Sequence, residues 1–588
     1  MPGICWYSSK RTGRSREFKV APRINDLFVL DRNTVRDVFI LSRLAGCRDA
    51  AGLRRESIME VTQMKIFPSL EEARSLAASG AYRVLPLSCE MLSDRLTPIE
   101  CLRILKGVST HCYLLESAED RERWGRYTFL GFDPVLDITC LDGEMKAGSV
   151  RMRTDDPSAV LRQILADYKS PRLPGLPPFT GGLVGYFAYD YLGYSEPSVR
   201  MDVEDSEHFQ DVDVMLFDKV IAFDHFRQKI VLIVNIRLDD VDTGYNRAVL
   251  ALEQLRTLLL TGGRRDEPGG RMTGPVEQLF DESQYCDMVE RAKGHIREGD
   301  IFQIVLSNRL SAPFEGSLLN TYRILRTINP SPYMFYFSRT DVEVAGASPE
   351  TLVKLEDGVL HTFPLAGTRP RGKTDEEDAK LEAELLADEK ELAEHNMLVD
   401  LGRNDLGRIS QFGTVKVEKL HSIERFSHVM HIGSTVRGEI REDKDALDAI
   451  EAVLPAGTLS GAPKLRACQL IGELENNKRG IYGGAIGYID FTGNMDTCIA
   501  IRIAWKKNGR VFVRSGAGIV ADSVPQKEYQ ECINKAKAVM NALEQAAAVE
   551  PVPLAGSTSP GESSGFQPGA AGTSALWNSA GAWREVEE

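Results

Sequence analysis

The sequence predicts an α+β protein in which strands and helices alternate irregularly along the chain. The stretch DVMLFDKVIAFDHFRQKIVLIVNIRL, residues 213–238, is typical of two apolar strands joined by a polar turn around Arg227 and Gln228. Residues 283–300, 374–403 and 526–548 instead carry the apolar repeat of amphipathic helices. Because 588 residues exceed what one hydrophobic core usually supports, more than one subdomain is expected.

Composition and pattern divide the chain into five stretches. We expect an N-terminal extension at 1–64, a strand-rich region at 65–259, a linker rich in Gly, Pro and charge at 260–277, a strongly patterned domain at 278–548, and a disordered tail rich in Gly, Ser, Ala and Pro at 549–588. In the extension, Asp31, Arg32 and Arg36 interrupt the apolar run that a secretory signal needs. This stretch is therefore expected either to precede a natural start at Met59 or Met64 or to be disordered.

The bulk composition excludes several classes of protein. A net charge of −14 argues against a nucleic-acid binder with a basic surface. No apolar run reaches the ~18 residues of a transmembrane helix. The 10 cysteines include no CxxC pair and no regular spacing, which is typical of reduced thiols. We expect a cytoplasmic protein that contacts neither nucleic acid nor membrane.

Two Glu-x-x-Glu pairs suggest a metal site. Glu391 and Glu394 lie in one predicted helix, and Glu528 and Glu531 lie in another. The i,i+3 spacing puts both carboxylates of a pair on one helix face, and carboxylate oxygens suit a hard cation such as Mg²⁺. The same spacing is common on solvated helices, so the flanking sequence has to support the interpretation.

Two glycine-rich stretches imitate nucleotide-binding loops without their context. GAGIVA, residues 516–521, has the loose dinucleotide pattern, but Pro525 follows at once and no acidic residue ends a second strand. GTLSGAPK, residues 457–464, has the wrong spacing for a phosphate loop. We reject both nucleotide readings, although such glycines let a carboxylate approach backbone N–H groups.

A series of motifs gives these features a common context. Residues 280–546 contain, in order, GDIFQIVLS (299–307), NPSPYMFY (329–336), GASPE (346–350), PLAGTRPRG (364–372), DEKELAEHNMLVDLGRNDLGR (388–408), VMH (429–431), PAGTLSGAPKLRA (455–467), IYGGAIGY (481–488), TCIAIR (497–502), GAGIVADS (516–523) and EYQECINKAK (528–537). This series resembles the chorismate-utilising enzymes, which include anthranilate synthase component I, aminodeoxychorismate synthase component I and the isochorismate and salicylate synthases. The resemblance implies large antiparallel β-sheets packed face to face with flanking helices, and makes 65–259 a regulatory region.

Three local features favour one member of this family. Ala366 stands where aminodeoxychorismate synthases typically carry a nucleophilic lysine, and Gln303 stands where the water-adding members tend to carry a lysine base. LLES, residues 114–117, together with NPSPYM resembles the tryptophan site of anthranilate synthase. The resemblance thus implies conversion of chorismate and ammonia to anthranilate and pyruvate with feedback by tryptophan. An aminodeoxychorismate synthase component I and a non-catalytic tryptophan- or chorismate-binding regulator remain alternatives.

The resemblance also implies roles for individual residues. Glu394 and Glu531 would bind Mg²⁺ directly, and Glu391 and Glu528 directly or through water. Glu350 would be the general acid if burial raises its pKa, and His431 the elimination residue, with His428 as a competitor. The remaining residues are those expected to hold chorismate (Gly367, Thr368, Tyr482, Arg502, Gly516, Ala517, Gly518 and Lys535) and tryptophan (Glu116, Ser117, Pro332, Tyr333 and Met334).

Ammonia needs a source outside this chain. No Gly-x-Cys-x-Gly nucleophile elbow surrounds any of the 10 cysteines, so the sequence contains no recognisable glutaminase segment. We therefore expect a separate glutamine amidotransferase subunit, the second component of the synthase, and a hetero-oligomer.

Overall fold

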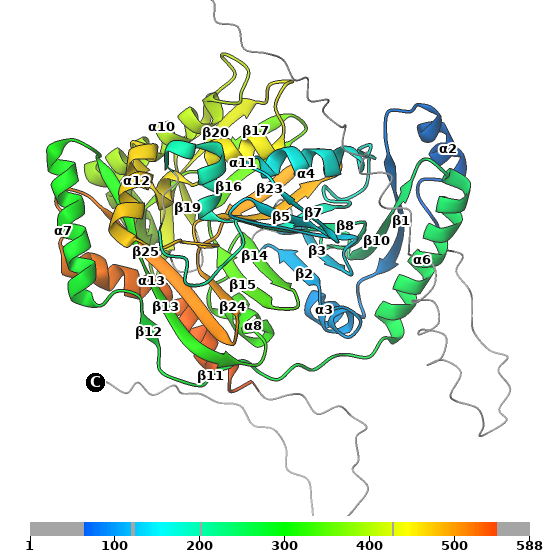
Figure 1. The fold of residues 1–588 in the computed structure, drawn as a ribbon, viewed down its shortest axis with the longest axis horizontal. Helices are drawn as coiled ribbons and strands as arrows, with labels where there is room; N and C mark the ends of the chain where they lie inside the picture. Colours follow the sequence, from blue (N-terminus) through cyan, green and yellow to red (C-terminus); the bar gives the residue numbers. More distant parts are fainter. Residues whose placement is uncertain (1–63, 119–123, 200–202, 426–428, 550–588) are drawn as a thin grey trace, which may run out of the picture. The chain divides into compact units, whose positions relative to one another are not determined.

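The computed structural model describes residues 64–118, 124–199, 203–425 and 429–549, which belong to one compact unit that begins at Met64 (Figure 1). The expected extension, apart from Met64, and the expected tail, apart from Val549, lie outside the described residues. Among the helices of these ranges, none combines the length and the apolar character that a membrane crossing requires.

Two antiparallel sheets form the framework. The first sheet has the strand order β1 (Val84–Leu92), β10 (Lys229–Arg237), β9 (Lys219–Asp224), β3 (Tyr127–Phe132), β2 (Cys112–Glu116), β14 (Tyr333–Ser338), β15 (Val342–Ser348), β24 (Ile503–Lys507), β25 (Arg510–Ile519), β13 (Gln303–Glu315) and β11 (Arg271–Met272), with β12 (Glu277–Gln278) and β21 (Gly461–Ala462) also paired to β13.

The second sheet has the order β18 (Leu365–Pro370), β20 (Val429–Glu439), β17 (Val359–Thr362), β16 (Thr351–Glu356), β23 (Met495–Ile499), β22 (Ala485–Asp490), β7 (Gly182–Phe187), β8 (Val212–Phe217), β4 (Leu136–Leu141), β5 (Glu144–Ala147) and β6 (Val150–Arg153), with β19 (Lys416–Arg425) on β20. Each sheet therefore contains strands from both sides of residues 260–277.

The main core lies where the two sheets meet. Tyr113 of β2 packs edge-on against Phe217 of β8, with ring centroids 4.7 Å apart. Phe129 of β3 meets Tyr488 of β22 at 6.0 Å in the same way. These aromatic contacts join one sheet to the other and belong to one buried cluster. The expected architecture of antiparallel sheets packed face to face is confirmed.

Helices cover the outer faces of the sheets (Figure 1). A second apolar cluster joins the first sheet to α3 (Pro98–Lys106), α6 (Val241–Thr261), α8 (Leu319–Ile328) and α13 (Pro525–Ala546). The second sheet is accompanied by α4 (Pro157–Ala166), α10 (Glu389–Gly407) and α11 (Ala446–Val453). A third cluster packs α7 (Glu282–Glu298), α12 (Lys464–Glu475) and α13 around β13 and β25. The remaining helices are α2 (Leu70–Ala78), α5 (Leu192–Ser195) and α9 (Asp375–Leu386), and 3₁₀ turns cover Trp124–Arg126, Tyr189–Tyr191, Pro197–Val199 and Gly457–Leu459.

Two predicted elements are each divided in the structure. The first strand predicted in 213–238 is two strands, β8 and β9, which belong to different sheets. The chain crosses between the sheets at Asp218, whose carbonyl accepts hydrogen bonds from the backbone N–H and the side-chain amide of Asn235 at 2.8 and 3.1 Å. The apolar pattern runs on through the crossing because both strands are buried on both faces.

The helix predicted at 374–403 is also two helices, α9 and α10. The break is at Asp388, whose carboxylate accepts hydrogen bonds from the backbone N–H groups of Lys390 and Glu391. Aspartate at this position starts a helix rather than continuing one, since its short side chain satisfies the exposed N–H groups of the first turn. The break places Glu391 and Glu394 near the start of α10.

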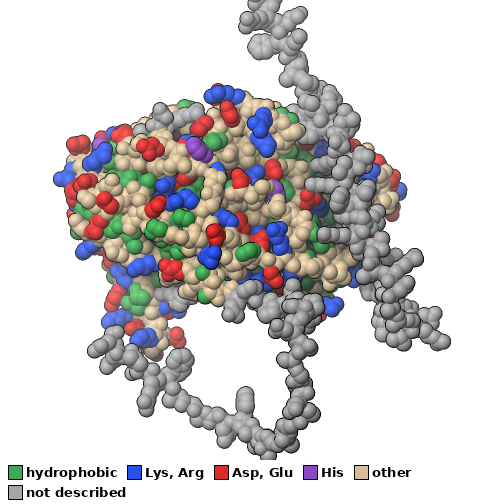
Figure 2. All heavy atoms as spheres, turned by 60° about the horizontal axis from the view of Figure 1, so that its bottom comes forward, with side chains coloured by type: hydrophobic (Ala, Val, Ile, Leu, Met, Phe, Trp, Pro, Cys, Tyr) green, Lys and Arg blue, Asp and Glu red, His purple; other side chains and the backbone are tan. Residues whose placement is uncertain are grey.

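Acidic and basic side chains are interspersed on the face drawn in Figure 2. This mixture agrees with the moderate negative net charge and is typical of a surface that does not attract a polyanion.

Candidate active site

A cavity of about 540 Å³ lies where α10 and α13 meet β13 and β25. It collects residues that the sequence separates by more than two hundred positions. Of the residues predicted from the sequence, its lining includes Glu350, Glu394, Tyr482, Arg502, Gly516, Gly518, Glu528, Glu531 and Lys535. The two positions that discriminate between family members, Gln303 and Ala366, line it as well.

Glu350 is the buried acid of this cavity. It follows β15, and Thr458 Oγ1 donates a hydrogen bond of 3.0 Å to its Oε1. Burial raises the pKa of Glu350 to about 7, although the hydrogen bond from Thr458 and the charges of Arg502 and Lys535 act in the opposite direction. A carboxyl group with this pKa is substantially protonated near neutral pH and can donate a proton.

Carboxylates gather on the helical side of the cavity. Burial raises the pKa of Glu394, and the neighbouring charges of Glu391 and Glu531 raise it further. Burial and the charge of Glu531 likewise raise the pKa of Glu528, against a hydrogen bond from Ser523. The Lys535 ammonium lies 2.8 Å from Glu531 and donates a hydrogen bond to the Gly516 carbonyl at 3.1 Å.

These carboxylates fit a hard divalent cation in chemical type. Three of them line one cavity from two helices, and their mutual repulsion is the kind that a bound cation relieves. No three of the four glutamates have oxygens within 4.8 Å of one another; in the described part of the chain only His295, Glu298 and Asp300 meet that spacing. Those three residues lie at the end of α7, and none of them lines the cavity.

The backbone is unusual at Arg502. Its φ is +51°, in the left-handed region that non-glycine residues seldom adopt. Its carbonyl accepts a hydrogen bond from the N–H of Ala347 in β15 at 3.2 Å, which helps to hold that conformation. Such strain persists where the surroundings impose it, and it is concentrated at functional sites. Here it places a guanidinium in the same cavity as Glu350.

Glycines in β25 allow the residues around the cavity to pack close to this strand. A Cβ on Gly516 would lie 2.7 Å from the carbonyl oxygen of Leu306 and 3.0 Å from the hydroxyl of Tyr482. A Cβ on Gly518 would lie 2.9 Å from the amide nitrogen of Gln303. The intervening Ala517 is fully buried in the cluster of α7, α12 and α13, so its side chain faces away from the cavity.

A second group of predicted residues lies beside the cavity and does not line it. His431 of β20 pairs with Thr368 of β18, and its Nδ1 lies 2.8 Å from the Gly367 carbonyl oxygen and 3.1 Å from Thr368 Oγ1. Gly367, with φ +64°, packs so closely that a Cβ would lie 3.2 Å from a carboxylate oxygen of Glu391. Burial lowers the pKa of His431, and the charge of Arg502 adds to this. The competitor His428 lies outside the described residues.

Sequence reasoning missed several residues of the site. Thr458 belongs to GTLSGAPK, which we rejected as a phosphate loop, and to the family motif PAGTLSGAPKLRA, but we assigned it no role. Beneath the cavity, buried Glu475 accepts hydrogen bonds from Arg479 and Arg514 and from the backbone and hydroxyl of Ser307. No local pattern indicates that these residues meet.

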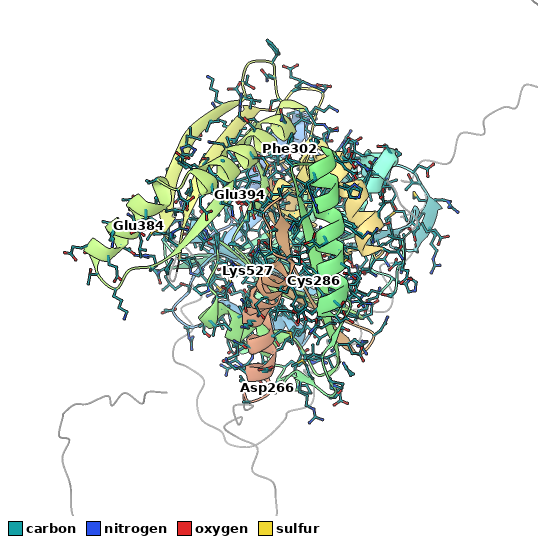
Figure 3. All side chains as sticks on the ribbon, turned by 90° about the vertical axis from the view of Figure 1, so that its left-hand side faces the viewer. Asp266, Cys286, Phe302, Glu384, Glu394 and Lys527 are labelled. Carbon is teal, nitrogen blue, oxygen red and sulfur yellow. The ribbon has the colours of Figure 1, made fainter. Side chains whose placement is uncertain are left out.

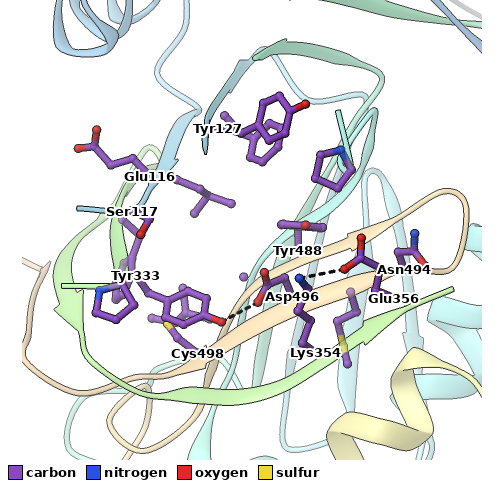
Figure 4. Close-up of a pocket in the computed structure, with 18 of the residues that line it drawn as sticks. Glu116, Ser117, Tyr127, Tyr333, Lys354, Glu356, Tyr488, Asn494, Asp496 and Cys498 are labelled. Carbon is purple, nitrogen blue, oxygen red and sulfur yellow. Dashed lines mark hydrogen bonds and ion pairs between the residues drawn. The ribbon is translucent and has the colours of Figure 1, made fainter. Parts of the chain in front are cut away.

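The five residues predicted to bind tryptophan line a second cavity, of about 490 Å³ (Figure 4). Glu116 of β2 pairs directly with Met334 of β14, which joins LLES to NPSPYM. The carboxylate of Glu116 is engaged by Tyr322 and by Arg326 of α8, at 3.0 Å for the latter. The Tyr333 hydroxyl donates to Asp496 at 2.9 Å and lies 2.9 Å from the hydroxyl oxygen of Thr351. The sequence did not indicate the other lining residues, among them Arg126, Tyr127, Lys354, Tyr488 and Asp496.

Comparison with known proteins identifies the relatives of this chain. Residues 110–541 match the family model described as chorismate binding enzyme. The chain is 46% identical over 495 residues to anthranilate synthase component 1 of Aquifex aeolicus, covering 82% of this chain and 98% of that protein. It is 45% identical over 494 residues to the protein of the same name from Acetivibrio thermocellus, covering 82% and 99%.

Two solved structures also match this chain. The crystal structure of anthranilate synthase component I from Streptococcus pneumoniae matches with a TM-score of 0.62 at 40% identity, covering 70% of this chain and 92% of that chain. The menaquinone-specific isochorismate synthase from Escherichia coli matches with a TM-score of 0.58 at 20% identity, covering 81% and 99%. The latter likeness concerns the fold alone.

Proposed function

The chain belongs to the chorismate-binding enzymes, and we propose that it is the catalytic component that converts chorismate and ammonia to anthranilate and pyruvate, the first committed step of tryptophan biosynthesis. One observation supports ammonia, rather than water or a lysine side chain, as the nucleophile. Gln303 and Ala366 both line the cavity, and neither side chain has the basic nitrogen that a water-activating or covalent route needs. The carboxamide oxygen of Gln303, buried and without a hydrogen-bond partner among the described residues, can orient ammonia.

In the first step, ammonia attacks C2 of the chorismate ring as the C4 hydroxyl leaves. Arg502 and Tyr482 hold the two carboxylates of the dianion, and the charged contact from Arg502 contributes more than the neutral one. Glu350 gives its proton to the departing hydroxyl, which leaves as water. The pKa of about 7 for Glu350 supports this role, because the group is protonated before the step and ionised after it.

Mg²⁺ is the proposed cofactor. Glu394 and Glu531 would hold the ion directly, with Glu391 and Glu528 direct or through water. When bound, it would neutralise the ring carboxylate and make the ring more electrophilic.

In the second step, the aminated ring loses pyruvate and becomes aromatic. Since a carbonyl oxygen can only accept, the contact with the Gly367 carbonyl places the proton of neutral His431 on Nδ1 and the lone pair on Nε2. The lowered pKa of His431 keeps the imidazole neutral near pH 7. We assign Nε2 as the base that takes the C2 proton while the bond from the ring to the enolpyruvyl oxygen breaks.

The proposal also includes inhibition by tryptophan and a partner subunit that supplies ammonia. Tryptophan would bind in the cavity of Figure 4, with its carboxylate facing Arg126 or Lys354 and its indole ring against Tyr127 and Tyr488. Inhibition requires that tryptophan and chorismate favour different states, and each then weakens the binding of the other. The name "component 1" of the relatives supports a second, glutamine-hydrolysing component.

The test is a direct assay. The purified chain is mixed with chorismate, Mg²⁺ and ammonium at alkaline pH, and anthranilate fluorescence is followed with and without EDTA or tryptophan. A signal that EDTA abolishes and tryptophan reduces is expected. Formation of p-aminobenzoate after addition of a lyase would replace this proposal with aminodeoxychorismate synthesis, and absence of both products would favour a regulator that only binds ligands.

A further inference from the structure

A large apolar side chain is exposed beside the active-site cavity. Phe302 is 73% exposed, whereas the next residue, Gln303, is only 7% exposed and lines the cavity. The first residue of β13 thus contributes to the cavity wall, and the residue before it projects outward. Leaving a phenylalanine this exposed forgoes the stabilisation of burial, and exposed aromatic side chains are enriched in protein interfaces.

The surroundings of Phe302 make it part of a patch. Its N–H donates to the Ala462 carbonyl at 2.7 Å, so residues 299–302 run beside the start of α12. Leu465, 37% exposed, lies in the first turn of that helix. Arg466 donates to Asp300 at 3.1 Å across the two segments. We call Phe302, Leu465, Asp300 and Arg466 the Phe302 patch: two apolar groups beside an ion pair, the composition of an interface core with a polar rim.

The cavity opens on the face that carries this patch. Exposed Lys390 of α10 and exposed Val524 and Lys527 at the start of α13 all line the cavity, so solvent reaches it between these helices. Figure 3 looks onto this face, with Phe302, Glu394 and Lys527 labelled on it. A partner seated on Phe302 would therefore lie next to Gln303, which lines the cavity, on the face where Lys390 and Lys527 are exposed.

We infer that the Phe302 patch is the docking surface for the glutamine-hydrolysing subunit, seated so that ammonia passes into the cavity beside Gln303. This inference rests on the proposed function. Ammonia must arrive with its lone pair free, whereas in neutral water most of it is protonated and cannot attack the ring. A subunit that covers the mouth delivers ammonia without release to solvent. Gln303, next to Phe302, offers the carboxamide oxygen that would receive it.

The test compares two sources of nitrogen in paired variants. Phe302→Asp puts a charge in the centre of the patch, and Phe412→Asp makes the same change at a fully exposed phenylalanine on the turn after α10. The last residue of α10 that lines the cavity is Leu398, nine residues before the end of the helix at Gly407, so Phe412 follows a further stretch of about 13 Å at the rise of an α-helix. Anthranilate formation is measured with glutamine plus the amidotransferase subunit from the same organism, and separately with ammonium alone.

Phe302→Asp is expected to lower the glutamine-dependent rate by about tenfold or more, as for a central interface residue. The ammonium-dependent rate should stay within about twofold, and Phe412→Asp should change neither rate. An unchanged glutamine-dependent rate in Phe302→Asp would overturn the inference, as would an equal loss with ammonium. If the unmodified chain makes no anthranilate from ammonium, the proposed function itself fails, which is a separate result.

Discussion

At the scale of single residues, burial raises the pKa of Glu350, and the hydrogen bond from Thr458 is the largest effect that opposes this rise. Thr458 donates to the carboxylate oxygen and so favours the ionised form, while burial favours the neutral form. The pKa of about 7 is the balance of these effects and of the charges of Arg502 and Lys535, which also favour the ionised form. A general acid acts only while protonated, so the activity that depends on it declines as the pH rises through this pKa.

Replacing Thr458 with valine should therefore shift the alkaline limb of the activity profile. Without the hydrogen bond the pKa of Glu350 rises further, and the decline of kcat/KM moves to higher pH by about half to one unit, the equivalent of one hydrogen bond. The profile of kcat/KM against pH, measured at saturating ammonia, checks this. Thr458→Ser restores the donor and should restore the profile; a shift to lower pH in Thr458→Val would contradict the assignment.

His431 offers a second prediction at this scale. Methionine is unbranched, apolar and long enough to fill much of the space of the imidazole, but it cannot take a proton. His431→Met should still consume chorismate and accumulate an aminated, non-aromatic intermediate, because only the second step needs the base. Mass spectrometry of the quenched reaction would detect it. Anthranilate formation at the normal rate would remove His431 from the mechanism.

The residues of the site could be predicted only where a motif preserves them. Glu350, Arg502 and the glutamate pairs lie in recognisable motifs, and the structure brings most of them into one cavity. Thr458 and Glu350 are 108 positions apart, and their contact depends on how β15 and the 457–459 turn approach. No periodicity encodes such an approach, because it results from the packing of whole sheets.

At the scale of elements, α12 is held to two strands by buried charge. Glu475 is fully buried, and it contacts Arg479 in the turn after the helix, Arg514 of β25 and Ser307 of β13. Arg479 also donates to the carbonyls of Leu459 and Val305 at 2.7 Å, which fixes the 457–459 turn that carries Thr458. Although burial favours the neutral form, the two guanidiniums lower the pKa of Glu475 below its ordinary value. Because Thr458 donates a hydrogen bond to Glu350, the environment of this proposed acid depends on the contacts that the end of α12 makes through Glu475 and Arg479.

Glu475→Gln should destabilise the fold by about 3–5 kcal/mol, since it leaves two buried guanidiniums with one fewer countercharge. Urea unfolding followed by tryptophan fluorescence measures the change. Glu473→Gln on the same helix removes an exposed carboxylate that lies 3.7 Å from Arg466, and it should cost less than about 1 kcal/mol. Equal losses in the two variants would contradict the buried network.

The pH dependence of this contribution follows from the lowered pKa. The Glu475 contribution is complete above the pKa of the group in the unfolded chain, and it is lost as the pH falls through the lower folded pKa. The difference in stability between the original chain and Glu475→Gln should therefore shrink in acid.

The type of most long elements was predictable from periodicity, whereas their partners and breaks were not. The amphipathic repeat at 526–548 corresponds to α13, because one apolar face suffices to define a helix. The crossing at Asp218 was missed because β8 is fully buried and β9 is buried except at Lys219, so the apolar pattern runs on from one strand to the next. The division at Asp388 was missed because the helical repeat continues through a capping residue.

At the scale of the molecule, the two cavities are joined through one strand pair. Tyr333 opens β14 within the tryptophan cavity and pairs with Ser348 at the end of β15. Glu350 follows two residues later, and its N–H donates to Ser348 Oγ at 3.3 Å. The Tyr333 hydroxyl also contacts Thr351, the next residue along. A ligand that moves Tyr333 therefore acts on Ser348 and Thr351, which lie on either side of the proposed acid in the chain.

Ser117→Leu should relieve inhibition by tryptophan and leave turnover intact. A leucine in the lining occupies part of the space available to the indole, while the chorismate cavity is untouched. The concentration of tryptophan that halves the rate should rise by about tenfold or more, the equivalent of about 1.4 kcal/mol. Inhibition titrations at fixed chorismate measure it; loss of turnover without relief would count against the site.

The interleaving of the two sheets also governs how the chain is made. β2 ends at Glu116, but its neighbour β14 begins at Tyr333, about two hundred residues later. A ribosome that adds about 5–20 residues per second needs about 10–40 s to supply that neighbour. During this interval the β2 edge presents unpaired backbone groups, the template on which aggregates grow. Protection of nascent chains by a chaperone should therefore matter most while residues 117–338 are being translated.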